Sequence, residues 1–240
     1  LRHADQRRRR QRHDGGTRVW CPCRIGNDRA LLLPPQGLDH ATGEWICFLG
    51  ADDYLWSSDV LERMSSHLTG AYPEFRLVYG KVVLVNADNQ AIGSIGQPWR
   101  DVRRRFRQLM SVPHPGLMHH RSIFKTHGRF DEGFRIAGDY EMLLRVLTTE
   151  DALFVENITI AGMQQGGVSS TPGFSMLQLV ETRIAQEKNN ITGPRLTYWS
   201  AVLRVRIRQF LWLLLGEGIT RTILDMGRRV LGKSRYWTRT

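Results

Sequence analysis

The stretch GEWICFLGADDYLW, residues 43–56, decides which fold is expected of this chain. Its apolar run, residues 45–49, ends in a Gly-Ala pair, and two adjacent carboxylates follow at once. An apolar run bounded by turn residues is typical of a buried strand. Because ligands of open α/β sheets bind at the carboxyl ends of strands, Asp52 and Asp53 stand where a ligand is expected.

Downstream of this stretch, the apolar pattern alternates between the period of strands and the period of helices. Strands are expected at 44–49, in two arms of 75–93 around a turn at 86–90, at 116–120 and at 152–162. Helices are expected at 57–68 with a Ser or Asp cap, at 101–110, 121–128 and 138–149, and, after a loop at 164–173, in two or three further segments. Strands that alternate with helices predict an α/β layered fold.

The composition is that of a globular protein with a strongly basic charge. The chain has 240 residues, of which 41% are hydrophobic, and a formal net charge of +11. Such a surplus suits an anionic partner, whether nucleic acid, lipid headgroups or a phosphorylated substrate. Three cysteines cannot form a disulfide framework, and Cys21-Pro-Cys23 lacks a second pair to complete a zinc site. A reducing, cytoplasmic compartment is therefore expected.

The pattern divides the chain into three expected segments. Residues 1–36 are Arg-rich and aperiodic, so they form an atypical segment, for which disorder is one reading. Residues 37–192 carry the alternating strands and helices, and residues 193–240 form a basic amphipathic helical tail.

Two readings of the adjacent acids stay open from the residues alone. In the first, one acid caps the following helix and the other is solvated, although Ser57 or Ser58 could cap that helix equally well. In the second, the pair holds a hard divalent cation, Mn²⁺ or Mg²⁺, which commonly bridges carboxylates to substrate phosphates.

The stretch GLDHATGEWICFLGADDYLW, residues 37–56, resembles the centre of the inverting, family 2 type glycosyltransferases of the GT-A fold. The family's metal-binding aspartate falls on Asp52, with Asp53 beside it, and Gly50 replaces the usual first acid. The resemblance implies a divalent cation at Asp52 and Asp53. It also implies that a nucleotide-sugar donor contacts Gly50, Ala51 and both acids.

A second stretch, VPHPGLMHHRSIFKTHGRFDEGFRIAGDYEMLLRV at 112–146, resembles the acceptor-side block of the same family. The resemblance implies that Asp139 is the catalytic base, whereas its position alone reads as a helix-start acid favoured by the dipole. The other residues implied on the acceptor side are His114, Gly116, Gly138, Glu141 and Arg145. The last two lie four apart, so they are expected to pair on the helix surface.

The resemblance implies a GT-A-like (Rossmann-like) mixed sheet flanked by helices, incomplete at the N-terminus, with a C-terminal helical extension. The family's D-G-S-x-D-G-T-like loop is reduced to HDGGTRVW, residues 13–20, so the N-terminal part reads as truncated, divergent or frame-disturbed. The implied activity is hexosyl transfer, with inversion, from a nucleotide sugar to a saccharide or lipid-linked acceptor. Two alternatives are an inactive remnant that binds a partner and, less favoured because no known module is present, a nucleic-acid-binding protein.

The tail allows two readings. Leu203, Ile207, Phe210, Leu211 and Leu214 recur at helical spacing among arginines. The stripe either packs on the catalytic domain or sinks into an anionic membrane surface, which would place the protein peripherally on the inner face of the cell membrane. The tryptophans at 45, 56 and 99 are expected to pack in the core by default.

Overall fold

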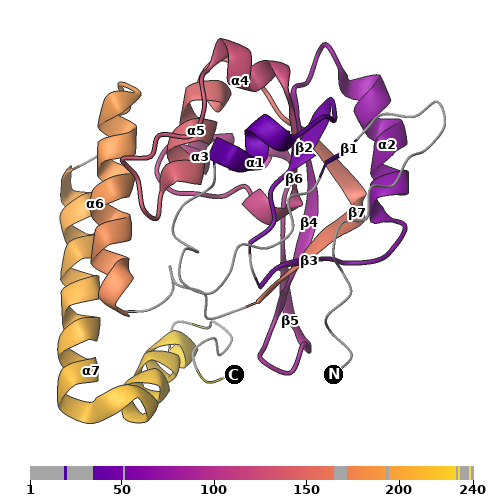
Figure 1. Cartoon of the computed structure of the whole chain (residues 1–240). Helices are drawn as coiled ribbons and strands as arrows, with labels where there is room; N and C mark the ends of the chain where they lie inside the picture. The colour runs from indigo at the N-terminus through magenta and orange to yellow at the C-terminus, as the bar shows by residue number, and fades with distance from the viewer. Residues whose placement is uncertain are drawn as a thin grey trace.

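The computed structural model describes residues 19–20, 35–50, 52–164, 172–192, 195–230, 232 and 238. These residues form a mixed seven-stranded sheet with helices on both faces (Figure 1). The strands are β1 (Val19–Trp20), β2 (Trp45–Cys47), β3 (Tyr54–Leu55), β4 (Leu77–Val85), β5 (Ala91–Ile95), β6 (Leu117–His120) and β7 (Leu153–Gln164). The helices are α1 (Pro35–His40), α2 (Val60–Ala71), α3 (Trp99–Phe106), the 3-10 turn η1 (His114–Gly116), α4 (Ser122–Thr126), α5 (Gly138–Leu147), α6 (Pro172–Lys188) and α7 (Arg195–Val230).

The sheet runs in the order β1-β2-β6-β4-β7-β3, and β5 pairs with β4 as a hairpin arm. The pairs β1–β2 and β4–β7 are parallel, whereas β2–β6, β4–β6 and β3–β7 are antiparallel. The expected mixed α/β sheet flanked by helices is therefore confirmed.

The central strands bury both of their faces, because successive side chains point to opposite sides of a strand. In β4, Leu77 and Tyr79 join one core cluster, and Val78 between them joins the other. In β2 and the residue after it, Ile46 and Phe48 face the first cluster, whereas Trp45 and Cys47 face the second. This two-sided burial explains why the strands read as nearly continuous apolar runs.

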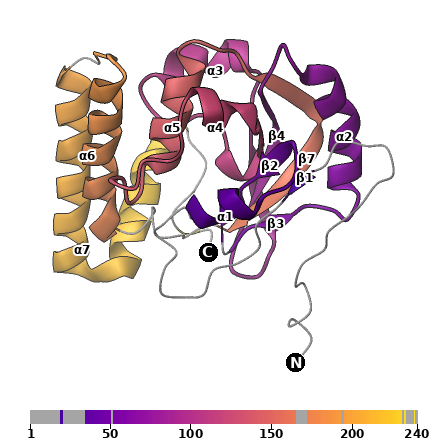
Figure 2. The ribbon, with the colours of Figure 1, turned by 45° about the horizontal axis from the view of Figure 1, so that its top comes forward.

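Each face of the sheet has its own helices. Helix α2 covers one face through Val60, Met64 and Leu68, which are fully buried. Helices α3 and α5 cover the other face, and α6 and α7 lie side by side outside α5 (Figure 2). Helix α6 still reaches that core through the buried Ala185. No helix among the described residues is long and apolar enough to cross a membrane.

The expected strands and helices are present, with bounds shifted by a few residues. The hairpin turn is closed by the Asn86 amide, which donates to the Gln90 carbonyl at 3.0 Å. The N-cap residue of α2 is an aspartate, Asp59, as expected, but its side chain makes no capping hydrogen bond, because its carboxylate accepts instead from the Ser57 hydroxyl. The core expectation holds for Trp45 and Trp99 but is wrong for Trp56, whose position outside the sheet leaves it 40% exposed.

Most of the N-terminal segment lies outside the described residues, as do Cys21, Cys23 and the loop at 165–171. Within that segment, β1 pairs in parallel with β2 through Val19 and Trp20. At the other end, α7 is one element with a bend at Gly216, where φ is 73°. The three segment boundaries stay a prediction.

Candidate active site

The two acids lie in a tight turn at the end of β2. The Gly50 amide donates to Asp53 Oδ2 at 2.9 Å, and the Asp53 amide donates to the Gly50 carbonyl at 3.2 Å. The Asp53 side chain is thus folded back over the turn and is half-buried, whereas Asp52 is exposed. Residue 51 lies outside the described residues, so the predicted donor contact of Ala51 has no structural account.

The acidic turn brings two neighbouring carboxylates together. Burial raises the pKa of Asp53, the adjacent Asp52 charge raises it further, and the hydrogen bond from Gly50 lowers it in part. Within the described residues, no ion pair involves either acid. No cluster of three or more His, Cys, Asp or Glu side chains forms a metal cage in the same part of the chain. The turn therefore offers two carboxylates rather than a complete coordination shell.

Gly50 stands where the family that the sequence resembles usually carries an acid, and a side chain at this position would meet the Asp53 carboxylate. A Cβ atom at this position would lie 2.7 Å from Asp53 Oδ2. This separation is shorter than real Cβ contacts allow, so a larger residue requires Asp53 to move. The glycine is thus coupled sterically to the second acid.

The predicted base, Asp139, lies in the first turn of α5 and is half-buried. Its Oδ1 accepts a hydrogen bond from the Tyr140 amide at 2.7 Å, which orients the carboxylate. Gly138, which begins the helix, is buried. A carboxylate in the first turn is also favoured by the positive end of the helix dipole.

A second carboxylate, Glu181 of α6, holds the backbone that leads into this turn. Its oxygens accept hydrogen bonds from three successive amides, those of Arg135, Ile136 and Ala137, at 2.9, 2.7 and 2.8 Å. Glu181 is buried, and hydrogen bonds to a charged acceptor are stronger than neutral ones. The position of Asp139 therefore depends on a side chain more than forty residues away in sequence.

His114 packs on the residue that follows β2 and lies near the start of α5. Its ring stacks on Phe48 with centroids 5.8 Å apart and lies edge-on to His119 at 5.3 Å. Burial lowers the pKa of His114, and the nearby Asp139 charge acts in the opposite direction. The Nε2 atoms of both histidines have no hydrogen-bond partner among the described residues. His114 is therefore a neutral, buried neighbour of the predicted base.

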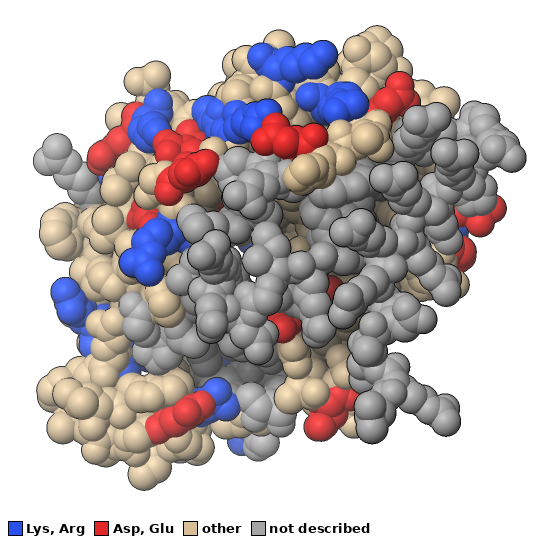
Figure 3. Space-filling view, viewed as in Figure 1, with Lys and Arg blue, Asp and Glu red and all other residues tan. Residues whose placement is uncertain are grey.

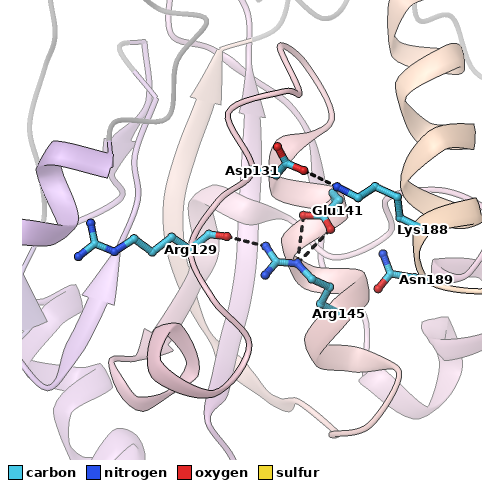
Figure 4. Close-up of a pocket in the computed structure, with 6 residues that line it drawn as sticks. All are labelled: Arg129, Asp131, Glu141, Arg145, Lys188 and Asn189. Atoms are coloured by element: carbon cyan, nitrogen blue, oxygen red, sulfur yellow. Dashed lines mark hydrogen bonds and ion pairs between the residues drawn. The ribbon is translucent and has the colours of Figure 1, made fainter.

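Glu141 and Arg145 form the expected pair, with 3.0 Å between Glu141 Oε1 and Arg145 Nε, but Glu141 is buried and does not lie on the helix surface as expected. Arg145 also donates to the carbonyls of His127 and Arg129, so the pair fastens the loop before α5. Together they face an open pocket of about 220 Å³ (Figure 4). The described residues lining this pocket are Arg129, Asp131, Glu141, Arg145, Lys188 and Asn189.

The predicted site residues therefore fall into separate groups. His114 and Asp139 are close enough for their charges to interact, whereas Asp139 is not among the described residues that line the Glu141 pocket. Gly116 is buried in packing, because a Cβ there would lie 2.6 Å from Val82 Cγ2. The acceptor role of these residues stays a prediction.

Sequence reasoning did not identify Glu181. One signal was present, because Glu181 interrupts a row at four-residue spacing between Leu177 and Ala185. An acid within such a row indicates a buried carboxylate that needs several donors. The identity of those donors could not be read, because they belong to a loop before another helix.

Comparisons with known proteins point to one class of reaction. No family model matches the chain. The chain is 27% identical over 138 residues to a protein named PGL/p-HBAD biosynthesis glycosyltransferase, found in Mycobacterium bovis and Mycobacterium tuberculosis. The match covers 57% of this chain, which spans about half (51%) of the length of these curated relatives.

Two solved structures are similar to the chain at low sequence identity. A mannosyltransferase from Pyrobaculum calidifontis, in complex with GDP-Man and Mn²⁺, is 15% identical with a TM-score of 0.45, over 86% of this chain and 60% of that one. Residues 1–349 of S. aureus TarS, in complex with UDP-GlcNAc, are 10% identical with a TM-score of 0.45, over 81% and 54%. The match to the curated relatives supports glycosyl transfer as the class of reaction.

Proposed function

We propose that this protein is an inverting, family 2 type glycosyltransferase on a GT-A scaffold, which moves a hexosyl group from a nucleotide sugar to a saccharide or lipid-linked acceptor. The observation that carries the proposal is that His114, whose ring stacks on Phe48, lies close enough to Asp139 for their charges to interact. The first turn of α5 therefore lies near the segment that follows β2, which leads into the turn with Asp52 and Asp53. A base and an acidic turn are the two parts that this chemistry requires.

Asp139 acts as the base in this proposal. In a single displacement, the acceptor oxygen bonds to the anomeric carbon while the bond to the diphosphate breaks, and the hydroxyl proton passes to a carboxylate. The Tyr140 amide holds Asp139 Oδ1, so we assign the proton to Oδ2. Burial lowers the pKa of His114, so this histidine adds no positive charge beside the carboxylate.

The acidic turn fits a divalent cation, Mn²⁺ or Mg²⁺. Burial raises the pKa of Asp53, the hydrogen bond from the Gly50 amide lowers it in part, and the Asp52 charge raises it, so a bound cation would favour the charged form of this carboxylate. Asp52 and Asp53 would hold the ion, and the donor's phosphates and water would complete its shell. Such an ion, when bound, neutralises negative charge on the leaving diphosphate.

Donor binding and turnover test the proposal separately. We expect a nucleotide sugar from a panel that includes UDP-GlcNAc and GDP-mannose to give binding heat by calorimetry in the presence of Mn²⁺. Asp139→Asn should keep that heat, because the amide preserves the shape, and should lose roughly 100-fold or more in turnover, because it cannot accept the proton.

Two results would count against this assignment. Turnover of Asp139→Asn within tenfold of the parent would remove Asp139 from the role of base. If no nucleotide sugar in the panel gives heat, with or without Mn²⁺, the alternative of an inactive remnant that binds a partner is favoured instead.

A further inference from the structure

Helix α7 carries apolar side chains on two opposite sides. Before the bend, one half-buried row lies on the side that packs on α6. This row consists of Tyr198, Ala201, Val202, Val205, Gln209 and Trp212. Because a helix advances about 100° per residue, a second row falls on roughly the opposite side. We call this second row the outer stripe, and it consists of Leu196, Trp199, Leu203, Ile207, Phe210 and Leu214.

The outer stripe is open to solvent. Its six side chains are between 49% and 84% exposed. Figure 3 shows the lower left of the molecule, where α7 bends in Figure 1, as a largely uncharged surface. Contiguous apolar residues at this exposure are unusual on a soluble surface and mark an interaction site.

A second exposed apolar row lies beyond the bend. Ile219, Ile223, Met226 and Val230 recur at spacings of three and four, and all four are exposed. Thr220 and Asp225, which lie on other sides of this segment, are buried. Both halves of α7 therefore present exposed apolar side chains.

Positive charge borders the outer stripe. By the same helical geometry, Arg206 falls on one margin and Arg204 on the other, and both are exposed. Arg208 points the other way, because it donates to the Ser175 hydroxyl of α6. Residues 195–216 contain four arginines and no acid.

We propose that the outer stripe binds an anionic lipid surface, with α7 lying in the plane of the headgroups. An apolar face at the acyl boundary with arginines beside it is the arrangement of an interfacial helix. Trp199 suits this depth, because its ring is apolar and its N–H is polar. Charge decides against a second copy of the chain as the occupant: pairing two outer stripes would bring arginines together with no acid in either segment to meet them.

Flotation of the full chain with vesicles tests this proposal without any nucleotide sugar. We expect recovery with vesicles of equal parts phosphatidylcholine and phosphatidylglycerol, little recovery with phosphatidylcholine alone, and a decline as salt rises. Arg204→Gln with Arg206→Gln should weaken partitioning by roughly 30-fold. Arg104→Gln with Arg105→Gln, equally exposed on α3, is the control for the same change in net charge.

The apolar arm uses Leu203→Gln with Phe210→Gln, and its control is Tyr72→Gln with Leu109→Gln, two exposed apolar positions outside α7. We expect the first pair to lose binding by more than tenfold and the control to keep it. Equal recovery with both vesicle types, or equal binding by both double variants, overturns the proposal. The proposal is also overturned if sedimentation shows a dimer that Leu203→Gln with Phe210→Gln dissociates, and if the parent chain does not bind vesicles.

Discussion

At the scale of single residues, Glu181 is the side chain on which the proposed base most depends. Glu181→Gln keeps the size of the side chain but replaces one of its two acceptor oxygens with an amide nitrogen, so at least one of the three backbone donors loses its acceptor. We expect a loss of about 1–3 kcal/mol in stability and a fall in kcat, with the donor Kd unchanged because the acidic turn is untouched. The measurements are steady-state kinetics, calorimetry and urea unfolding.

The matched control is Glu187→Gln, the same change on the same helix, at an exposed acid that pairs only with Arg183 among the described residues. It should leave kcat and stability near the parental values. If Glu181→Gln lowers kcat no more than Glu187→Gln does, Glu181 has no part in positioning Asp139.

Asp52 carries a second prediction at this scale. Because its side chain is exposed, Asp52→Ala should leave the unfolding midpoint unchanged and should remove stimulation of sugar transfer by Mn²⁺. Transfer is measured across an Mn²⁺ series, and Asp88→Ala, at an exposed acid of the β4–β5 turn, serves as control. Parental transfer that Mn²⁺ still stimulates would assign the metal to other residues.

At the scale of elements, the bend of α7 rests on one residue. Gly216 has φ 73° and ψ 176°, a conformation that is essentially restricted to glycine. We expect Gly216→Ala to destabilise the bent form by about 1–3 kcal/mol. Urea unfolding followed by circular dichroism should show an earlier transition.

Gly227, on the same helix, is a glycine that the backbone does not require. Its backbone is helical, and a Cβ there would meet nothing within 4 Å. Gly227→Ala should therefore raise stability by up to about 1 kcal/mol. If Gly216→Ala proves as stable as Gly227→Ala, the bend does not depend on the glycine.

The sequence predicted the elements better than it predicted their contacts. The alternation of Ile46, Cys47 and Phe48 and the helical spacing on α2 and α5 were legible, because burial on a sheet face or a helix stripe imposes a period. The exposure of Trp56 and the second apolar side of α7 were not legible, because a period says which residues share a side and not which side has a partner.

At the scale of the whole molecule, buried histidines make the fold sensitive to acid. Burial lowers the pKa of His119 well below the ordinary 6.5. As the pH falls below 6.5, His119 takes up a proton in the unfolded chain before it does so in the folded one. The stability that is present above pH 6.5 is therefore lost as the pH falls toward the lower pKa of the folded state. We expect the urea midpoint to fall over this window. His119→Met should flatten the fall, whereas His67→Met, at an exposed position, should not.

Glu150 is a second group that makes stability depend on pH. It pairs with Arg76, next to β4, and with His127, next to α4. Burial alone would raise the pKa of Glu150, but hydrogen bonds and charges from Arg76 and His127 lower it overall. The contribution of Glu150 to stability is present above its ordinary pKa of 4.5, and it is lost as the pH falls through the lower pKa of the folded state. Arg76→Gln should reduce the loss below pH 4.5, and a midpoint curve parallel to the parent's would contradict this account.

The candidate site was predicted only where its parts are local in sequence. The acidic turn, the Glu141–Arg145 pair and the helix start at Asp139 each lie within a few residues. The clamp by Glu181 and the stacking of His114 on Phe48 join segments whose distance depends on the packed sheet. No local pattern encodes such contacts.

The close approach of Gly50 and Asp53 has a consequence for substitutions at position 50. Restoring an acid at position 50 would make the carboxylate of Asp53 and the new Cβ compete for the same space. A library that varies position 50 alone should therefore return residues larger than glycine only where the Asp53 carboxylate gives up its hydrogen bond from the amide of residue 50. A library that also shortens residue 53 removes this cost, so it should accept more residue types at position 50.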